Sequence, residues 1–182
     1  MRSRKNNKKR RVLASRDVHK FTQECLQQHV PLHDSGPKCT AGTVWNVLLW
    51  AAARVASIAA VCRRWQNGLS DQCVYDALAE QLPRRPRILE KKLNAALVHH
   101  LPRAVLKRAR PVAIDYHEIP YHGEPLKNAN ELCHGKPKSG TTKFHAYATV
   151  CIVEKGQRFT LAYTWVKRRE KQTVVIARLL ER

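Results

Sequence analysis

Two stretches near the C-terminus, residues 144–153 and 158–166, are rich in aromatic and β-branched residues. That composition is typical of β-strands. The polar residues 154–157 between them include Gly156, which favours a turn, so we predict a hairpin. Upstream, the apolar run 111–114 predicts a further strand that ends at Asp115. A carboxylate there is costly to bury unless it binds something. The pattern is therefore one strand, a long loop and a hairpin.

The most hydrophobic part of the chain, residues 44–61, is about as long as a membrane helix. Arg54 lies at its centre, and an arginine in mid-bilayer costs about 2.5–3.5 kcal/mol on insertion scales. We therefore expect no membrane partner and interpret this run as a buried helix or a pair of helices.

The following residues have the spacing of a helix-turn-helix. Apolar positions recur at helical intervals over 58–65, the turn would lie at 67–69, and Ser70 can cap a second helix that stops before Pro83. The exposed face of the second helix would be acidic, which repels phosphates. A plain helical bundle remains the alternative. The acidic residues are Asp71, Asp76 and Glu80.

Residues 84–110 contain many cations and a single acid, Glu90. Apolar residues at helical spacing would give these cations a rigid support: Leu89, Leu93, Ala96, Leu97 and Leu101. We predict a DNA-binding surface here, extended by lysines later in the chain, with an ordinary solvated helix face as the alternative. The predicted DNA-binding residues are Arg84, Arg85, Arg87, Lys91, Lys92, Arg103, Lys107, Arg108, Lys136, Lys138 and Lys143.

Composition strengthens the case for a polyanionic partner. The 182 residues include 34 Lys and Arg against 14 Asp and Glu, a formal charge of +20, which favours nucleic acid over a membrane surface. Hydrophobic residues make up 43%, enough for a core. Residues 1–17 predict a basic, disordered arm. The six cysteines form no C-x-x-C pair and no apolar signal precedes them, so we expect reduced thiols and a cytoplasmic protein.

Two apparent motifs fail on inspection, one on spacing and one on residue type. Cys25, His29, His33 and Cys39 do not match a common zinc finger, so we interpret them as incidental residues of a loop. Residues 135–142 nearly match a phosphate-binding P-loop, but a threonine stands where its lysine should be, and a strand is expected to follow rather than a helix.

Four blocks of residues resemble a known family. They are 112–115 (VAID), 121–123 (YHG), 135–144 (GKPKSGTTKF) and 147–149 (YAT). With them the chain resembles, over about residues 40–182, the insertion-sequence transposases of the DDE (Asp, Asp, Glu) superfamily. The resemblance implies an α+β protein: a helical, helix-turn-helix-like DNA-binding domain (18–108), then an incomplete ribonuclease-H-like domain (109–182) of three antiparallel strands plus a helix.

The resemblance also implies an activity, which is transposition: DNA recombination in which metal ions assist strand cleavage and transfer at the ends of a transposable element. Double-stranded DNA would be the partner and Mg²⁺ or Mn²⁺ the cofactor. Asp115 would be the first catalytic, metal-binding carboxylate. The chain departs from the pattern because the second Asp and the Glu are missing, and no spacing makes Glu118, Glu124 or Glu131 a substitute.

We therefore expect a truncated, catalytically incomplete transposase whose sheet has an unpaired edge and exchanges amide hydrogens quickly over 144–166. One alternative is a non-enzymatic DNA-binding protein that regulates transposition by competing with an intact transposase for transposon ends or by pairing with it. A second copy of the chain or an intact transposase would be the protein partner. Another is a basic RNA-binding protein, which would show aromatic residues on an exposed sheet face. Phe159, Leu161, Tyr163 and Trp165 occupy every second position of the strand and so share one face. We expect that face to be the core, which would bury Tyr163 and Trp165.

Overall fold

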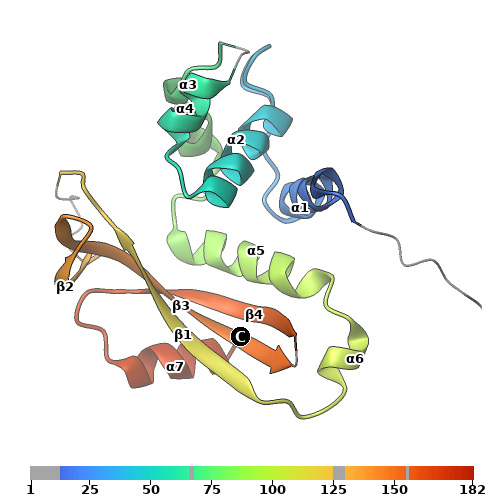
Figure 1. Ribbon diagram of the computed structural model, residues 1–182, viewed down its shortest axis with the longest axis vertical. Helices are drawn as coiled ribbons and strands as arrows, with labels where there is room; N and C mark the ends of the chain where they lie inside the picture. The colour runs from blue at the N-terminus through green and yellow to red at the C-terminus, as the bar shows by residue number, and fades with distance from the viewer. Residues whose placement is uncertain (1–12, 66–67, 125–129, 155) are drawn as a thin grey trace, which may run out of the picture. The chain divides into compact units, whose positions relative to one another are not determined.

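The computed structural model describes residues 13–65, 68–124, 130–154 and 156–182, and it divides into two compact units, Met1–Leu82 and Pro83–Arg182 (Figure 1). Within the described residues the first unit contains only helices, and the second combines helices with a four-stranded antiparallel sheet. The predicted α+β class is confirmed. The division falls at residues 82–83 rather than near 108, because the helix that follows Pro83 binds a strand of the sheet.

Four helices form the first unit: α1 (Ser15–His29), α2 (Ala41–Arg54), α3 (Ile58–Arg64) and α4 (Asp71–Gln81). Helix α1 begins at Ser15, inside the range 1–17 that we predicted as an arm, while residues 1–12 lie outside the described residues. Helix α1 also includes Cys25 and His29, which we had assigned to a loop. Its apolar residues Val18, Phe21, Cys25 and Leu26 recur at helical spacing, so the sequence did contain the signal for this helix.

The predicted helix pair in residues 44–61 is confirmed. Helix α2 ends at Arg54, Val55 adopts the left-handed conformation (φ 51°, ψ 44°), and the Ser57 side chain caps α3 by accepting a hydrogen bond from the Ala60 N–H at 3.1 Å. Among the described residues no single helix could cross a membrane; α2 and α3 together would pass on length and composition, but a bend of 110° separates them.

The helix predicted after Ser70 is also confirmed. The Ser70 hydroxyl accepts a hydrogen bond from the Cys73 N–H at 3.2 Å and caps α4. Asn67, which we placed in the preceding turn, lies outside the described residues, whereas Gly68 has a positive φ of 63°. The residues buried in this unit include Val44, Val47 and Val74.

The second unit runs through helices α5 (Pro86–His99) and α6 (Arg103–Leu106), strands β1 (Val112–Pro120), β2 (Cys133–Lys138), β3 (Thr141–Glu154) and β4 (Gln157–Val166), and helix α7 (Gln172–Leu180). Strand β3 is central: it pairs with β1 on one edge and with β2 and β4 on the other. The predicted hairpin is β3–β4. The sheet has four strands, whereas we predicted three. The strand we missed is β2, whose polar sequence carries no strand signal.

The near-match to a P-loop is the β2–β3 hairpin. Lys138 pairs with Thr141, and Ser139 and Gly140 between them both have positive φ (52° and 79°). That geometry is a tight hairpin turn, which favours glycine at its second position. A strand follows, as we expected.

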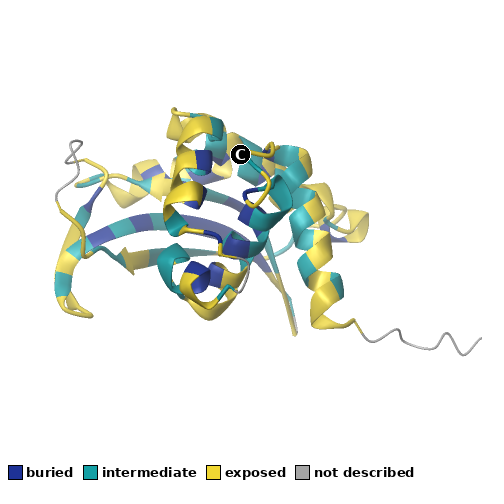
Figure 2. Cartoon of the chain, turned by 90° about the horizontal axis from the view of Figure 1, so that it is seen from above, coloured by how far each residue is buried: buried dark blue, intermediate teal, exposed yellow. Residues whose placement is uncertain are grey.

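The two faces of the sheet differ in chemistry. Helix α7 covers one face, where Val175 and Leu179 pack against Ala148, Val150 and Ala162 of β3 and β4. Figure 2 shows the buried positions that run along these strands. Residues at alternate positions therefore point to the opposite face, where polar and aromatic side chains gather.

A β-bulge places Tyr163 and Trp165 on that opposite face. Pairing shifts by one residue between Val150 and Cys151, so that Ala162 pairs with Val150, and Tyr163 with Thr149. A shift of one residue exchanges the two faces of the strand beyond it. The expectation that Tyr163 and Trp165 face the core together with Leu161 was therefore wrong: Leu161 packs against the cluster under α7, and Trp165 is 37% exposed.

Candidate nucleic-acid interface

Helix α5 is attached to the outer edge of β4 by two buried polar side chains. Asn94 donates to the Tyr163 carbonyl at 2.9 Å and accepts from the Tyr163 N–H at 2.8 Å. Two positions further along β4, the Trp165 N–H donates to the Glu90 carboxylate at 3.2 Å. The backbone groups of an edge strand need such partners when they are away from water. The helix therefore completes the sheet at this edge.

Glu90 is surrounded by donors. Its carboxylate also accepts from the Thr164 hydroxyl at 3.1 Å and pairs with Arg182, and only 3% of the residue is exposed. A buried charge is tolerated when it is paired and hydrogen-bonded in this way. The one acid of residues 84–110 is thus directed inward, where it adds no negative charge to the surface.

The cations of the same segment point outward. Arg87 and Lys91 lie one helical turn apart on α5 and are exposed, and Lys92 is half-buried. The other predicted cations of this segment are exposed as well: Arg84, Arg85, Arg103, Lys107 and Arg108. A helix face with exposed cations and an internally paired acid suits phosphate binding. We refer to these eight residues as the α5 basic surface.

A second group of predicted cations lies at the β2–β3 hairpin. Lys136 and Lys138 on β2 are exposed and Lys143 on β3 is half-buried. A shallow hollow beside this turn is lined by Lys143 together with Tyr121, His122 and Thr141. Thr141 donates to the Tyr121 carbonyl at 2.8 Å, which holds the chain after β1 against the hairpin.

Asp115 lies inside a strand rather than at its end. Strand β1 continues to Pro120, and Asp115 pairs with Thr149 of β3 on the face opposite α7. Its Oδ2 lies 3.4 Å from His117 Nε2 and 3.6 Å from an Arg158 guanidinium nitrogen, and 49% of its side chain is exposed. The expected strand end was wrong because we took the apolar run 111–114 for the whole strand.

The donor set around Asp115 does not fit the expected Mg²⁺ or Mn²⁺ site. Hard cations of this kind need several oxygen ligands, and a two-metal site needs carboxylates to hold both ions. Here a histidine and the Arg158 guanidinium are the nearby groups, and within the described residues no three His, Cys, Asp or Glu side chains come together as a metal site. Glu118 belongs to the other side of β1, since it is an odd number of positions from Asp115.

Arg158 also influences a buried thiol next to this site. Burial would raise the pKa of Cys151, but hydrogen bonds with Thr160, Arg158 and Thr149 outweigh burial and hold that pKa below its usual range. Cys151 Sγ lies 3.5 Å from Thr160 Oγ1. Because Cys151 is fully buried, this arrangement supports the sheet and is not a nucleophilic site.

Aromatic rings cross the same face of the sheet. His117 of β1 stacks on Tyr147 of β3, with centroids 4.8 Å apart, and Tyr147 meets Trp165 of β4 edge-on at 6.4 Å. Tyr163 meets Trp165 in the same manner at 6.0 Å. We refer to these four residues as the aromatic row. Sequence reasoning missed it because the β-bulge that creates it depends on strand pairing.

The helix-turn-helix interpretation receives no support from the surface of α4. Asp76 and Glu80 are exposed and Asp71 is half-buried. These carboxylates disfavour contact with phosphates, as the sequence indicated. The zinc alternative for Cys25, His29, His33 and Cys39 also gains nothing, since the described residues contain no such metal-binding group.

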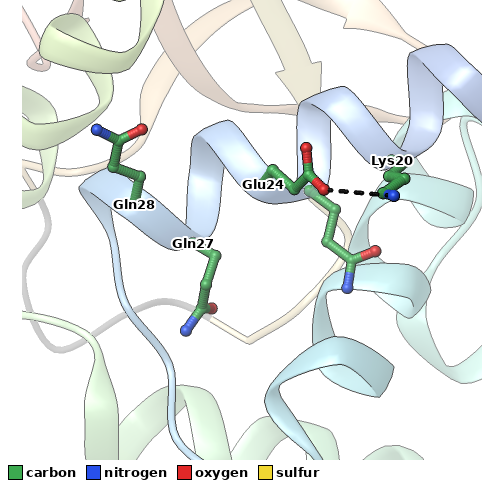
Figure 3. A pocket seen from close by; sticks show the side chains of 5 residues that line it. Lys20, Glu24, Gln27 and Gln28 are labelled. Carbon is green, nitrogen blue, oxygen red and sulfur yellow. Dashed lines mark ion pairs between the residues drawn. The ribbon is translucent and has the colours of Figure 1, made fainter.

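A hollow beside α1 is lined by Lys20, Gln23, Glu24, Gln27 and Gln28 (Figure 3). Lys20 pairs with Glu24 at 3.8 Å, which leaves the lining close to neutral. Gln27 is engaged elsewhere, since its amide oxygen accepts from the Trp45 indole N–H at 2.7 Å. The hollow is a surface feature of one helix and supplies no chemistry for catalysis.

Comparison with models of protein families, with curated proteins and with solved structures found no match. Function is therefore inferred from the α5 basic surface, from the groups around Asp115 and from the four sequence blocks described above.

Proposed function

We propose that this chain binds duplex DNA through the α5 basic surface as a transposase-like protein. One observation carries the proposal: Glu90 is buried and paired with Arg182, while Arg87, Lys91 and their neighbours remain exposed. A surface of fixed cations on a helix held against a sheet matches the electrostatic requirement for phosphate contacts.

The arrangement of strands supports the transposase-like part of the proposal. Strands β1, β3 and β4 are antiparallel neighbours with β3 in the middle, and a helix follows them against one face. This is the order in which a ribonuclease-H-like domain opens. Asp115 lies on the first strand, where the family places its first carboxylate, but its neighbours do not complete a metal site. We propose that the chain contributes DNA binding, with transposition as its context and no strand cleavage of its own.

The test is the salt dependence of binding to a blunt duplex, measured by fluorescence anisotropy. The slope of log affinity against log salt falls by about 1 for each phosphate contact that is lost. Replacing Arg87 and Lys91 together by glutamine should lower the slope by about 2. The matched control replaces Arg16 and Lys20, also one helical turn apart and exposed, on α1. Equal losses in both double variants would contradict a specific role for α5.

Single-stranded RNA binding is a second candidate, and the aromatic row favours it. Bases stack on exposed aromatic side chains of a sheet, and each stacked base contributes about 1–3 kcal/mol. Trp165 is the most accessible member of the row. If RNA is the ligand, Trp165→Ala should weaken binding to an unstructured RNA by about tenfold and leave duplex DNA binding unchanged. Binding of RNA that is insensitive to Trp165 would remove this candidate.

A further inference from the structure

The corner between α2 and α3 contains a hollow of about 260 Å³ that lies entirely within the first unit. Two indoles and two guanidiniums surround it over an apolar floor, and its lining contains no acid. The residues are Trp50, Arg54, Ala56, Ala60, Val61, Arg64 and Trp65. Pockets for drug-sized ligands usually measure about 300–1,000 Å³, so this hollow suits a smaller planar group.

One ring and one cation of this hollow contact each other. The Arg54 guanidinium carbon lies 4.5 Å from the centroid of the Trp50 ring, a cation–π contact that fixes both side chains. Even so, 41% of Trp50 is exposed. An exposed indole beside two arginines can accept a flat aromatic group on its surface and an anion beside it.

The backbone turns sharply at this corner, through a left-handed residue at the C-terminus of α2. Val55 adopts the left-handed conformation, which costs energy for a β-branched residue, and 96% of it is exposed. Packing of the Val55 side chain therefore does not compensate for the strain. The conformation ends α2, because the Val55 and Ala56 N–H groups donate to the Ala52 and Ala51 carbonyls. It also permits the 110° bend between α2 and α3, which brings Trp50 and Trp65 to the same hollow.

We infer that this hollow binds one unpaired nucleotide. Its base would stack on the indole of Trp50 or Trp65, and its phosphate would accept hydrogen bonds from the Arg54 and Arg64 guanidiniums. The same chemistry occurs in a free mononucleotide and in an unpaired nucleotide at a DNA end. The inference goes beyond the proposed function, because duplex binding through α5 needs no unpaired base.

The test compares one blunt duplex with the same duplex carrying a short unpaired 3′ overhang. The full chain should bind the overhang duplex about tenfold more tightly, as expected for one stacked base. Trp50→Ala and Arg64→Gln should each abolish this preference and leave blunt-duplex affinity within about twofold. Free dAMP is added as a competitor: if it removes the preference the site also accepts mononucleotides, and if it does not the site requires a strand. Either result supports the inference.

Two matched controls locate the effect. Arg63→Gln removes an exposed arginine that does not line the hollow, and Trp165→Ala removes a tryptophan of the aromatic row. Both variants should retain the preference. The inference is overturned if the wild type shows no preference for the overhang, or if Trp165→Ala rather than Trp50→Ala abolishes that preference. It is also overturned if Trp50→Ala weakens binding to phosphatidylglycerol vesicles and leaves binding to the overhang duplex unchanged. Blunt-duplex binding that depends on Arg87 and Lys91 would stand in each case, so the two proposals fail separately.

Discussion

Thr164 and Tyr163 are adjacent residues of β4, and each has a buried hydroxyl. The first hydroxyl has hydrogen-bond partners, and the second has none among the described residues. The Thr164 hydroxyl donates to Glu90 and accepts from Arg178 Nε at 2.8 Å, and the residue is completely buried. Arg178 continues the network to Glu170 at 2.7 Å and ties α7 to the chain that follows β4. The Tyr163 hydroxyl is buried, but it has no hydrogen-bond partner among the described residues.

These two hydroxyls should respond differently to removal. Thr164→Val should lower the free energy of unfolding by about 1–3 kcal/mol, because it leaves buried charged partners with one bond fewer. Tyr163→Phe should be neutral or stabilising by up to about 1 kcal/mol, since it removes a polar group that gains nothing from burial. Urea unfolding of both variants at neutral pH measures the contrast. A Tyr163→Phe variant as unstable as Thr164→Val would show that the tyrosine hydroxyl is bonded after all.

The raised pKa of the buried Tyr163 hydroxyl also predicts that the protein loses stability at alkaline pH. Burial, reinforced by the negative charge of Glu90 and opposed by Arg182, raises its pKa from 10.0 to about 12. A raised folded-state pKa contributes stability that is complete below the unfolded value and is lost as the pH rises through the folded value. The wild type should therefore lose stability relative to Tyr163→Phe between about pH 10 and 12. Parallel curves for the two proteins would contradict this assignment.

At the scale of elements, the sheet has one edge closed by a helix and one edge without a strand partner in the described residues. Helix α5 closes the edge at β4 through Asn94 and Glu90, whereas β1 pairs only with β3. Strand β3 lies between them, and Phe144, Ala148 and Cys151 on it are fully buried. In place of fast amide hydrogen exchange across residues 144–166, we therefore predict slow exchange in β3 and faster exchange at the outer edge of β1.

Closure by α5 can be tested through one amide. In the wild type the Tyr163 N–H should exchange slowly, because Asn94 accepts it on the edge that lacks a neighbouring strand. Asn94→Ala should make this amide exchange much faster and cost about 1–3 kcal/mol of stability. Asn94→Asp is a second variant: it retains an acceptor for the Tyr163 N–H, so this amide should stay slow, although the new carboxylate lies against the Tyr163 carbonyl and one turn from Glu90 and should also cost stability. Equal exchange in all three proteins would show that α5 does not close this edge.

At the scale of the whole molecule, the positive charge supports binding to a polyanion but not catalysis. The formal charge of +20 attracts polyanions to the protein, but charge of this kind does not cleave a phosphodiester. Cleavage by the family that the chain resembles requires carboxylates that hold metal ions. Asp115 lies beside His117 and Arg158 instead of other carboxylates, so we expect DNA binding without strand scission.

Asp115→Asn tests this expectation directly. Both the wild type and the variant should leave a duplex intact in Mn²⁺ and bind it with the same affinity. Stability should change by less than about 1 kcal/mol, because the ion pair with Arg158 is roughly half-exposed on both sides (52% and 49%). Gel analysis of strand cleavage and urea unfolding are the measurements. Cleavage by the wild type that Asp115→Asn abolishes would mean that other carboxylates complete a metal site.

Local chemistry alone determined several features of this protein. The β3–β4 hairpin follows from aromatic and β-branched runs around a glycine turn, α4 begins at its Ser70 cap, and the basic character of residues 84–110 is a property of composition. These signals act over a few residues, so they can be recognised without a fold.

Tertiary structure decided the features that depend on a partner outside the element itself. Strand β2 is polar and becomes a strand by pairing with β3. Glu90 interrupts the apolar stripe of α5, and its inward direction is set by Thr164 and Arg182 far along the chain. The bulge at Val150 reverses the face that Trp165 occupies. In each case the outcome depends on a contact with another element, which is adjacent in sequence for β2 and the bulge and remote for Glu90, and the pattern of the single element does not encode it.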